Sequence, residues 1–153
     1  MAIKMREISG LEDHLGYWLR YVSNHVSNAF RRKVEAKGVT VAEWVVLREL
    51  YAGSLAPSAV AERIGMTRGA ISKLADRLEE KALLTRASGK NDGRYQELAL
   101  TPAGRVLVPQ LALLADQNDE EFFGHLSREE RAAIEHLMKE IVRKSGLRAV
   151  PID

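Results

Sequence analysis

The sequence predicts a mainly α-helical protein that contains one small β-hairpin. Apolar residues recur every three or four positions over most of the 153 residues, which is the spacing of one face of an α-helix. Between Leu83 and Gly104, by contrast, two short runs with alternating apolar residues flank a loop rich in Gly, Asn and Asp. That pattern is typical of a hairpin. The length suits about one domain with a sizeable core.

The first predicted helix begins near Leu11 and ends at Gly38. Ser9 and Glu12 are three residues apart and fit a capping box at its start. The helix would contain about 25 residues, and its apolar stripe is longer than the core of a small domain needs. We therefore expect part of this stripe to pack against a partner chain.

The next three helices are predicted from their start signals. Thr40 and Glu43 form a second capping box, and Pro57 suits the first turn of a short third helix. After a tight turn at residues 65–66, Thr67 can cap a fourth helix with a narrow apolar stripe and several basic side chains. Two helices joined by a short turn that contains Gly, the second capped and basic, favour a helix-turn-helix.

Two strands are predicted after the fourth helix, at residues 83–87 and 95–100. They flank a polar loop that carries positive charge. A helix-turn-helix followed by such a hairpin is the organisation of a winged helix-turn-helix lobe.

Two further helices complete the predicted fold. A Thr-Pro pair at residues 101–102 starts one that runs to about residue 123, and Pro109 should kink or break it. Ser127 and Glu130 form a third capping box, which opens the last helix.

The chain is thus divided into three regions of one compact unit, not into independent domains. These are an N-terminal dimerisation helix (residues 1–38), a winged helix-turn-helix DNA-binding region (residues 39–101) and C-terminal dimerisation helices (residues 102–153).

Composition excludes every site that needs a cysteine. The chain has no cysteine, so it cannot form a disulfide, a thiolate metal site or a cysteine nucleophile.

Net charge is only +2, but residues 68–94 contain seven basic side chains against four acidic ones. A basic surface in the middle of the chain is therefore predicted. The charged N-terminus lacks the apolar run of a signal peptide, and we expect a soluble, cytoplasmic protein.

The sequence resembles the MarR family of bacterial transcriptional regulators over nearly its whole length. Three segments in this order carry the resemblance: "MTRGAISKLADRLEEKALLTR", then Asp92-Gly93-Arg94, then "LALTPAG". The resemblance implies a homodimer whose terminal helices interlock and whose two winged lobes face successive major grooves of DNA. It also implies a regulator that commonly represses genes and releases DNA when a small aromatic ligand binds.

The exposed faces of the fourth helix and the tip of the hairpin are the expected DNA contacts, since positive charge and short polar side chains suit phosphates and base edges. A solvated helix face that binds nothing is the alternative. In the resembled family the wing Arg enters the minor groove, which implies this role for Arg94, and Asp92 would pair with a nearby Arg and orient it. The expected DNA-binding residues are Ser58, Thr67, Arg68, Ser72, Lys73, Arg77, Lys90, Asp92 and Arg94.

A ligand pocket is expected on the first two helices, where aromatic walls and one cation would suit an aromatic carboxylate. The alternative is that these aromatic side chains belong to the core. The expected ligand-binding residues are Tyr17, Trp18, Tyr21, Trp44 and Arg48.

No motif indicates an enzyme, a cofactor or a metal site. The four histidines, at positions 14, 25, 125 and 136, lack metal-ligand spacing, although a composite zinc site with Glu12, Asp119 or Glu121 is an alternative. We expect a dimeric, sequence-specific DNA-binding regulator, a repressor that a small aromatic ligand releases from a pseudo-palindromic operator. The alternative function is a winged-helix module that binds proteins and not DNA.

Overall fold

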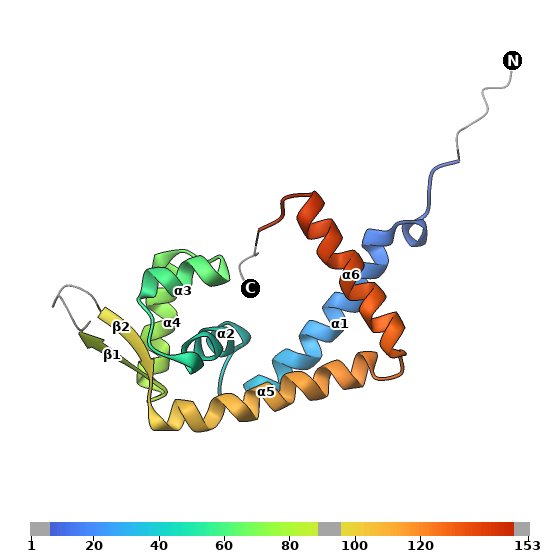
Figure 1. Cartoon of the computed structure of the whole chain (residues 1–153). Helices are drawn as coiled ribbons and strands as arrows, with labels where there is room; N and C mark the ends of the chain where they lie inside the picture. The colour runs from blue at the N-terminus through green and yellow to red at the C-terminus, as the bar shows by residue number, and fades with distance from the viewer. Residues whose placement is uncertain (1–6, 89–95, 149–153) are drawn as a thin grey trace, which may run out of the picture.

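The computed structural model describes residues 7–88 and 96–148. A lobe formed by α2, α3, α4 and the hairpin lies at one end of the molecule, and α5 runs from this lobe to α1 and α6 at the other end (Figure 1). The elements are η1 (Leu11–Asp13), α1 (Leu15–Glu35), α2 (Val41–Glu49), η2 (Leu50–Ala52), α3 (Pro57–Ile64), α4 (Arg68–Glu80), β1 (Leu84–Ser88), β2 (Gln96–Leu100), α5 (Pro102–Phe123) and α6 (Arg128–Lys144).

Two of the three predicted capping boxes are confirmed. The Thr40 hydroxyl accepts a hydrogen bond from the Glu43 N–H at 3.1 Å, and the Glu43 carboxylate accepts from the Thr40 N–H at 3.2 Å. Ser127 and Glu130 form the same reciprocal pair at the start of α6. These hydrogen bonds lower the pKa of Glu130. The caps occupy backbone donors that a helix start otherwise leaves unpaired.

The predicted capping box at Ser9 is wrong. The N–H of Gly10 donates to the carboxylate of Asp13 at 2.7 Å, and residues 11–13 form a single 3₁₀ turn. The helix α1 begins only at Leu15, after this turn, and has 21 residues. Glu12 contributes its carbonyl oxygen instead, which accepts from Trp18 Nε1 at 2.9 Å.

The predicted break at Pro109 does not occur, since α5 continues through this residue. Proline removes one helical hydrogen bond, the one to the carbonyl four residues earlier. That carbonyl belongs to Arg105, and both Arg105 and Pro109 are exposed. Water can therefore satisfy the carbonyl oxygen, and the helix tolerates the proline.

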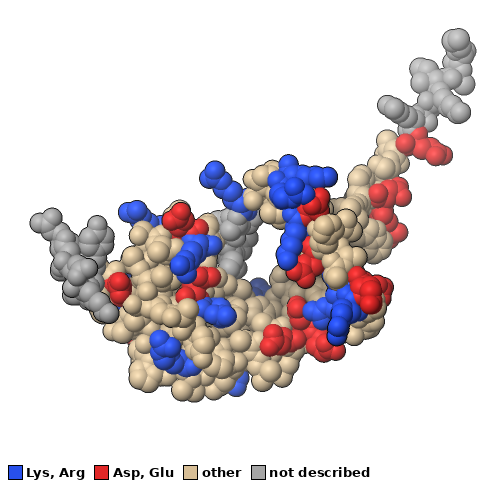
Figure 2. Space-filling model, in the orientation of Figure 1, with Lys and Arg blue, Asp and Glu red and all other residues tan. Residues whose placement is uncertain are grey.

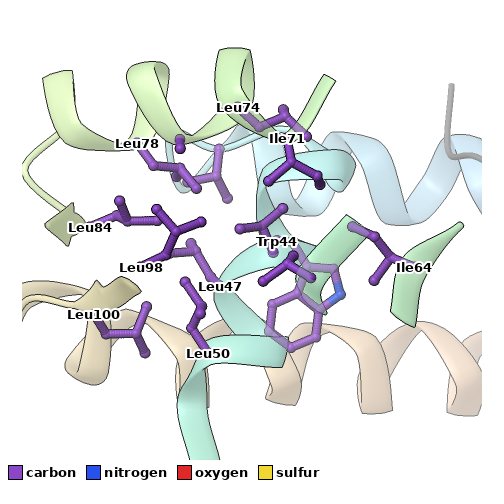
Figure 3. Packing of buried hydrophobic residues seen from close by; sticks show 14 of the residues in the cluster. Trp44, Leu47, Leu50, Ile64, Ile71, Leu74, Leu78, Leu84, Leu98 and Leu100 are labelled. Atoms are coloured by element: carbon purple, nitrogen blue, oxygen red, sulfur yellow. The ribbon is translucent and has the colours of Figure 1, made fainter. Parts of the chain in front are cut away.

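The hydrophobic core lies in the lobe, between α2, α4, the hairpin and the first half of α5 (Figure 3). Leu47 and Leu50 from α2 and its end face Ile71 and Leu78 from α4, and Leu98 from β2 closes the same cluster. All five side chains are fully buried. The core therefore fixes which face of α4 points inward, and its polar faces point to solvent.

The hairpin is antiparallel, and its register pairs Leu84 with Leu100 and Ser88 with Gln96. The predicted strands are confirmed, with β1 shifted by one residue and β2 beginning at Gln96, since Tyr95 lies outside the described residues. Leu55, before α3, adds a bridge to β2: its N–H donates to the Leu98 carbonyl at 3.1 Å and its carbonyl accepts from Leu98 at 2.8 Å. This bridge attaches the base of the hairpin to the segment that leads into α3.

The start of α5 packs tightly against the turn between α4 and β1. The Thr101 hydroxyl caps α5 at the Gly104 N–H and also donates to the Ala82 carbonyl at 2.7 Å. A Cβ atom added at Gly104 would overlap the carbonyl oxygen of Leu83. Thr101 and Gly104 of "LALTPAG" therefore allow the start of α5 to pack closely against the backbone of residues 82–83.

The helices outside the lobe leave apolar side chains exposed. No residue of α6 is buried, and its apolar stripe of Ile134, Leu137, Met138, Ile141 and Val142 faces solvent. Leu15, Leu19 and Val22 do the same on α1. Among the described helices, none is long and apolar enough to cross a membrane.

Candidate nucleic-acid interface

The turn between α3 and α4 orients the two helices as a helix-turn-helix. Gly65 has φ 72°, a left-handed conformation that glycine adopts without strain, and the Met66 N–H closes the turn on the Ala61 carbonyl at 3.0 Å. Thr67 then caps α4 by accepting a hydrogen bond from the Ala70 N–H at 3.1 Å. The predicted helix-turn-helix is confirmed, and its second helix begins at Arg68.

The helix α4 separates apolar and polar side chains cleanly. Ile71, Leu74, Ala75 and Leu78 are buried. The predicted DNA-binding residues of this helix are all exposed, and the predicted Ser58 is exposed on α3. Thr67 is exposed as well, but its hydroxyl oxygen is engaged in the cap. The exposed residues of α4 that were predicted to contact DNA are Arg68, Ser72, Lys73 and Arg77.

The basic side chains of α4 are available for a ligand. Among the described residues, no ion pair engages Arg68, Lys73 or Arg77. Arg68 lies in the first turn of α4, and Arg77 lies about two and a half turns further along the helix. Nine residues of an α-helix place Arg68 and Arg77 on opposite sides of the helix axis, a placement suited to phosphate oxygens on either side of a groove.

Arg86 on β1 pairs with two acidic side chains of this helix. Its guanidinium lies 2.8 Å from the Asp76 carboxylate and 2.7 Å from the Glu79 carboxylate. It also donates to the Ser72 carbonyl oxygen at 3.3 Å. One strand residue therefore holds the hairpin against α4 and offsets part of the negative charge that would repel DNA. Sequence reasoning counted Arg86 as basic but assigned it no role.

The remaining predicted DNA contacts, Lys90, Asp92 and Arg94, lie outside the described residues. The structure gives the position of the hairpin base from which their loop extends, because β1 ends at Ser88 and β2 begins at Gln96. That base is attached to α4 by Arg86. On the face shown in Figure 2, Lys and Arg side chains are spread over the lobe that contains α3 and α4.

An open groove of about 410 Å³ lies beside this surface. Its floor is apolar, and Met66 and Leu74 contribute to it. Lys73 and Arg77 of α4 form one rim, and Arg31 with Glu35, near the end of α1, forms part of the other. The groove and the predicted DNA surface therefore share two cations.

The five predicted ligand-binding residues lie in three separate environments. Tyr17, Trp18 and Tyr21 cluster on α1, with ring centroids 5.3 to 6.3 Å apart. Trp44 is 9% exposed, belongs to the core and packs against the Phe30 ring. Arg48 is exposed, and its guanidinium lies 5.9 Å from the Tyr51 ring centroid.

No group of three or more His, Asp or Glu side chains within residues 7–88 and 96–148 could hold a metal ion. The Lys33 ammonium lies 2.6 Å from the carboxylate of Glu121, one of the acidic residues considered for a composite zinc site. Asp119, another of them, pairs with Arg131 at 3.2 Å.

Comparison with known proteins finds relatives along most of the chain. A sequence model of the MarR family matches residues 37–94. The HTH-type transcriptional repressor MdtR of Bacillus subtilis is 33% identical over 116 residues, which are 72% of this chain and 72% of that protein. The HTH-type transcriptional regulator PrsX of Escherichia coli is 26% identical over 110 residues, 70% of this chain and 66% of that protein.

Solved structures share the fold. Bordetella bronchiseptica BpsR, whose DNA binding is regulated by 6-hydroxynicotinic acid, superimposes with a TM-score of 0.76 at 26% identity, covering 88% of this chain and 97% of that one. A Staphylococcus aureus MepR-DNA complex gives a TM-score of 0.77 at 24% identity, covering 86% of this chain and 98% of that one. The arrangement of α1 to α6 and the hairpin is therefore that of these winged-helix proteins.

Proposed function

The chain belongs to the MarR family of transcriptional regulators, and we propose that it is a homodimeric, sequence-specific DNA-binding repressor that a small aromatic ligand releases from its operator. Its activity is regulatory and not enzymatic. Double-stranded DNA is its partner, and its location is the cytoplasm. The winged helix-turn-helix, residues 39–101, makes the DNA contacts, whereas residues 1–38 and 102–153 join the two copies.

The observation that carries the proposal is the surface of α4. Arg68, Lys73 and Arg77 are exposed and form no ion pair within the described residues, while Asp76 and Glu79 of the same helix are engaged by Arg86. An α-helix with such a face fits the major groove of DNA, and the adjacent hairpin can reach the neighbouring minor groove. Ser58, Thr67 and Ser72 supply polar contacts beside these cations, and Lys90, Asp92 and Arg94 belong to the wing loop.

Dimerisation is supported by the exposed apolar stripes of α1 and α6. Monomeric proteins seldom leave so many large apolar side chains on contiguous helices in water. A two-fold symmetric pairing of these helices would bury the stripes and present two copies of α4 to one face of DNA. The operator is then a near-palindrome with half-sites about one helical turn apart.

The repressor role and the effector rest on relatives and on α1. MdtR is named a repressor, and BpsR responds to 6-hydroxynicotinic acid. In this chain, Tyr17, Trp18 and Tyr21 offer a cluster of aromatic side chains outside the lobe. Aromatic rings of a ligand could stack on such a cluster. Because Trp44 lies in the core, the proposal depends on the three residues of α1.

Selection of bound duplexes from a random DNA pool, followed by a salt titration on the enriched sequence, tests DNA binding. We expect a near-palindrome and an affinity that falls steeply as the salt concentration rises. Failure to enrich any sequence, together with binding that does not depend on salt, would favour the protein-interaction module instead.

Titration with salicylate-like acids tests the effector. The chain has two tryptophans, so Trp44→Phe leaves only the exposed Trp18 as a reporter and Trp18→Phe leaves only the buried Trp44. We expect saturable quenching in the wild type and in Trp44→Phe, and weaker operator binding by the wild type at the same concentrations. Quenching confined to Trp18→Phe, or no saturable change in any protein, would contradict an aromatic site on α1.

A further inference from the structure

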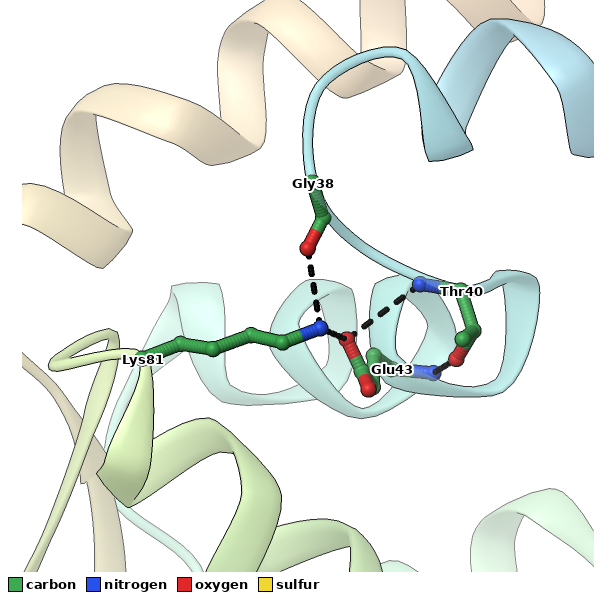
Figure 4. Close-up of polar contacts among 4 residues, drawn as sticks. All are labelled: Gly38, Thr40, Glu43 and Lys81. Atoms are coloured by element: carbon green, nitrogen blue, oxygen red, sulfur yellow. Dashed lines mark hydrogen bonds and ion pairs between the residues drawn. The ribbon is translucent and has the colours of Figure 1, made fainter.

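An ion pair between a buried carboxylate and a partly exposed ammonium lies at the C-terminal end of α4. Glu43 is 1% exposed, and its carboxylate lies 2.7 Å from the Lys81 ammonium (Figure 4). The same ammonium donates to the Gly38 carbonyl oxygen at 2.8 Å. Lys81 is the residue that caps α4, whereas Gly38 and Glu43 flank the corner between α1 and α2. The pair therefore joins segments 38 residues apart in the sequence.

Stability alone does not account for this pair. A capping box requires only that Glu43 accept from the Thr40 N–H, which exposed glutamates also do, as Glu130 does in α6. Burying the Glu43 charge costs solvation free energy that its attraction to the partly exposed Lys81 ammonium often only balances. Two charge-assisted hydrogen bonds from one ammonium do provide direction, because they fix the position of Lys81 relative to one carbonyl oxygen and one carboxylate oxygen.

The pair lies next to the two segments that connect the lobe to the rest of the molecule. Gly38, at φ 86°, ends the corner from which α1 leaves the lobe toward its exposed apolar stripe. On the other side of Lys81, Ala82 has φ 58° and its carbonyl accepts from the Thr101 hydroxyl at 2.7 Å. The end of α4 is thus held by the α1–α2 corner on one side and by the start of α5 on the other.

We propose that Glu43 and Lys81 are positioning residues for DNA binding: their ion pair sets the angle between α4 and α1, and hence the separation of the two α4 helices in the dimer. The inference rests on the proposed function, because the separation matters only to a dimer that reads two half-sites. Neither side chain needs to touch DNA.

The test measures how strictly the protein selects half-site spacing. The double variant E43Q/K81M removes both charges together, so no buried charge is left unpaired, and the amide oxygen of the introduced glutamine can still accept from the Thr40 N–H. Operators with the selected spacing, with one or two base pairs added or removed, and with a single half-site are compared. We expect the wild type to bind the operator with the selected spacing more tightly than the altered ones. In E43Q/K81M this ratio of affinities should fall about tenfold, because two linked binding events lose their shared geometry. Half-site affinity and salt slope should not change.

Two controls distinguish positioning from a general loss of structure. The Arg63 guanidinium lies 3.5 Å from the Glu49 carboxylate in the same lobe. The double variant E49Q/R63M removes this ion pair and should keep the spacing preference. K81R retains the positive charge at position 81 and should keep most of the spacing preference. Because the chain has no cysteine, Ser72→Cys allows one spin label per chain. The distance between labels in the DNA-free dimer should be narrowly distributed in the wild-type background and broader with E43Q/K81M.

Each outcome decides between the proposals. A folded, dimeric E43Q/K81M with unchanged spacing preference and label distances overturns the positioning role while the proposed function stands. An equal loss on half-site and full-site operators also overturns it, since the lobe itself would be impaired. If E43Q/K81M is too unstable for DNA binding, the K81R distances decide: a distribution as narrow as that of the wild type supports the proposal, and a broad one in a folded dimer overturns it. Absence of any wild-type operator overturns both proposals.

Discussion

At the scale of single residues, the candidate interface depends on which charges are paired and which are not. Asp76 and Glu79 lie on the same helix as Lys73 and Arg77, so the positive potential of α4 would be much reduced if all four were free. Arg86 engages both carboxylates. The cations that are expected to contact DNA therefore act without competing intrahelical partners.

Replacing Arg77 or Lys73 by alanine should weaken DNA binding at every sequence. Each change removes one cation from the phosphate-facing surface, so the slope of log affinity against log salt should fall by about one ion. Fluorescence anisotropy at several salt concentrations measures this. Lys139→Ala, which removes an exposed cation from α6, is the control and should leave the slope unchanged. Arg94→Ala in the wing loop carries the same expectation as Arg77→Ala, and an unchanged slope would remove that side chain from DNA contact.

Replacing Arg86 by alanine should also weaken DNA binding, although the residue is not expected to reach DNA. The substitution leaves two carboxylates beside the phosphates, and screening should make the loss larger at low salt than at high salt. Operator affinity at two ionic strengths measures the effect, which we expect to be about three- to tenfold at low salt. Adding D76N and E79Q to R86A should recover most of the affinity. No recovery would indicate that Arg86 acts through the position of the hairpin and not through charge.

At the scale of elements, the start of α5 and the turn between α4 and β1 leave no room for a side chain at Gly104. Thr101 and Gly104 lie at the start of α5, and the chain turns from α4 into β1 directly beneath them. The orientation of α5, which leads from the lobe to α6 and the exposed stripes, depends on this contact. The joint therefore links the lobe to the part of the molecule that is expected to dimerise.

Replacing Gly104 by alanine should destabilise the fold, because the new methyl group overlaps the Leu83 carbonyl and the backbone must shift. Overpacking of this kind costs about 1–3 kcal/mol. Denaturant unfolding measures the change. Gly69→Ala is the matched control, since nothing lies within 4 Å of its added Cβ, and helix propensity predicts a gain of up to about 1 kcal/mol. Equal stability of the two variants would show that the joint can relax.

At the scale of the whole molecule, the single chain has one well-packed lobe and a second region that lacks a core of its own. The buried cluster comes almost entirely from the lobe and from the parts of α1 and α5 next to it, whereas α6 buries no residue. As a monomer, this arrangement leaves the apolar stripe of α6 in contact with water. Interlocking with a second copy would supply the missing apolar contacts.

Replacing Leu137 by glutamate should therefore produce a monomer. Leu137 is 61% exposed in the centre of the α6 stripe, and a carboxylate there would have to lose its water in the dimer interface. Sedimentation equilibrium at micromolar concentration measures the mass. His136→Glu places the same charge on the neighbouring, solvent-facing position and should remain dimeric. A dimeric Leu137→Glu protein would place the interface elsewhere.

Much of the fold was determined by the sequence itself, because the relevant interactions are short-range. The Thr40 and Ser127 capping boxes, the Thr67 cap and the hairpin each depend on residues a few positions apart, and the apolar stripe of α4 correctly indicated its exposed cations. The start of α1 was mispredicted because Asp13 accepts from the Gly10 N–H, where the spacing of Ser9 and Glu12 also fits a capping box.

Only the tertiary structure decided how distant side chains meet. Trp18 and Trp44 occupy similar helical patterns, yet one is 47% exposed and the other lies in the core, since periodicity shows which residues share a face and not what covers it. The contacts of Arg86 with α4 and of Lys81 with Glu43 depend on how strand and helices pack. Spacing along the chain carries no information about such pairs, because their geometry exists only after the elements have assembled around a common core.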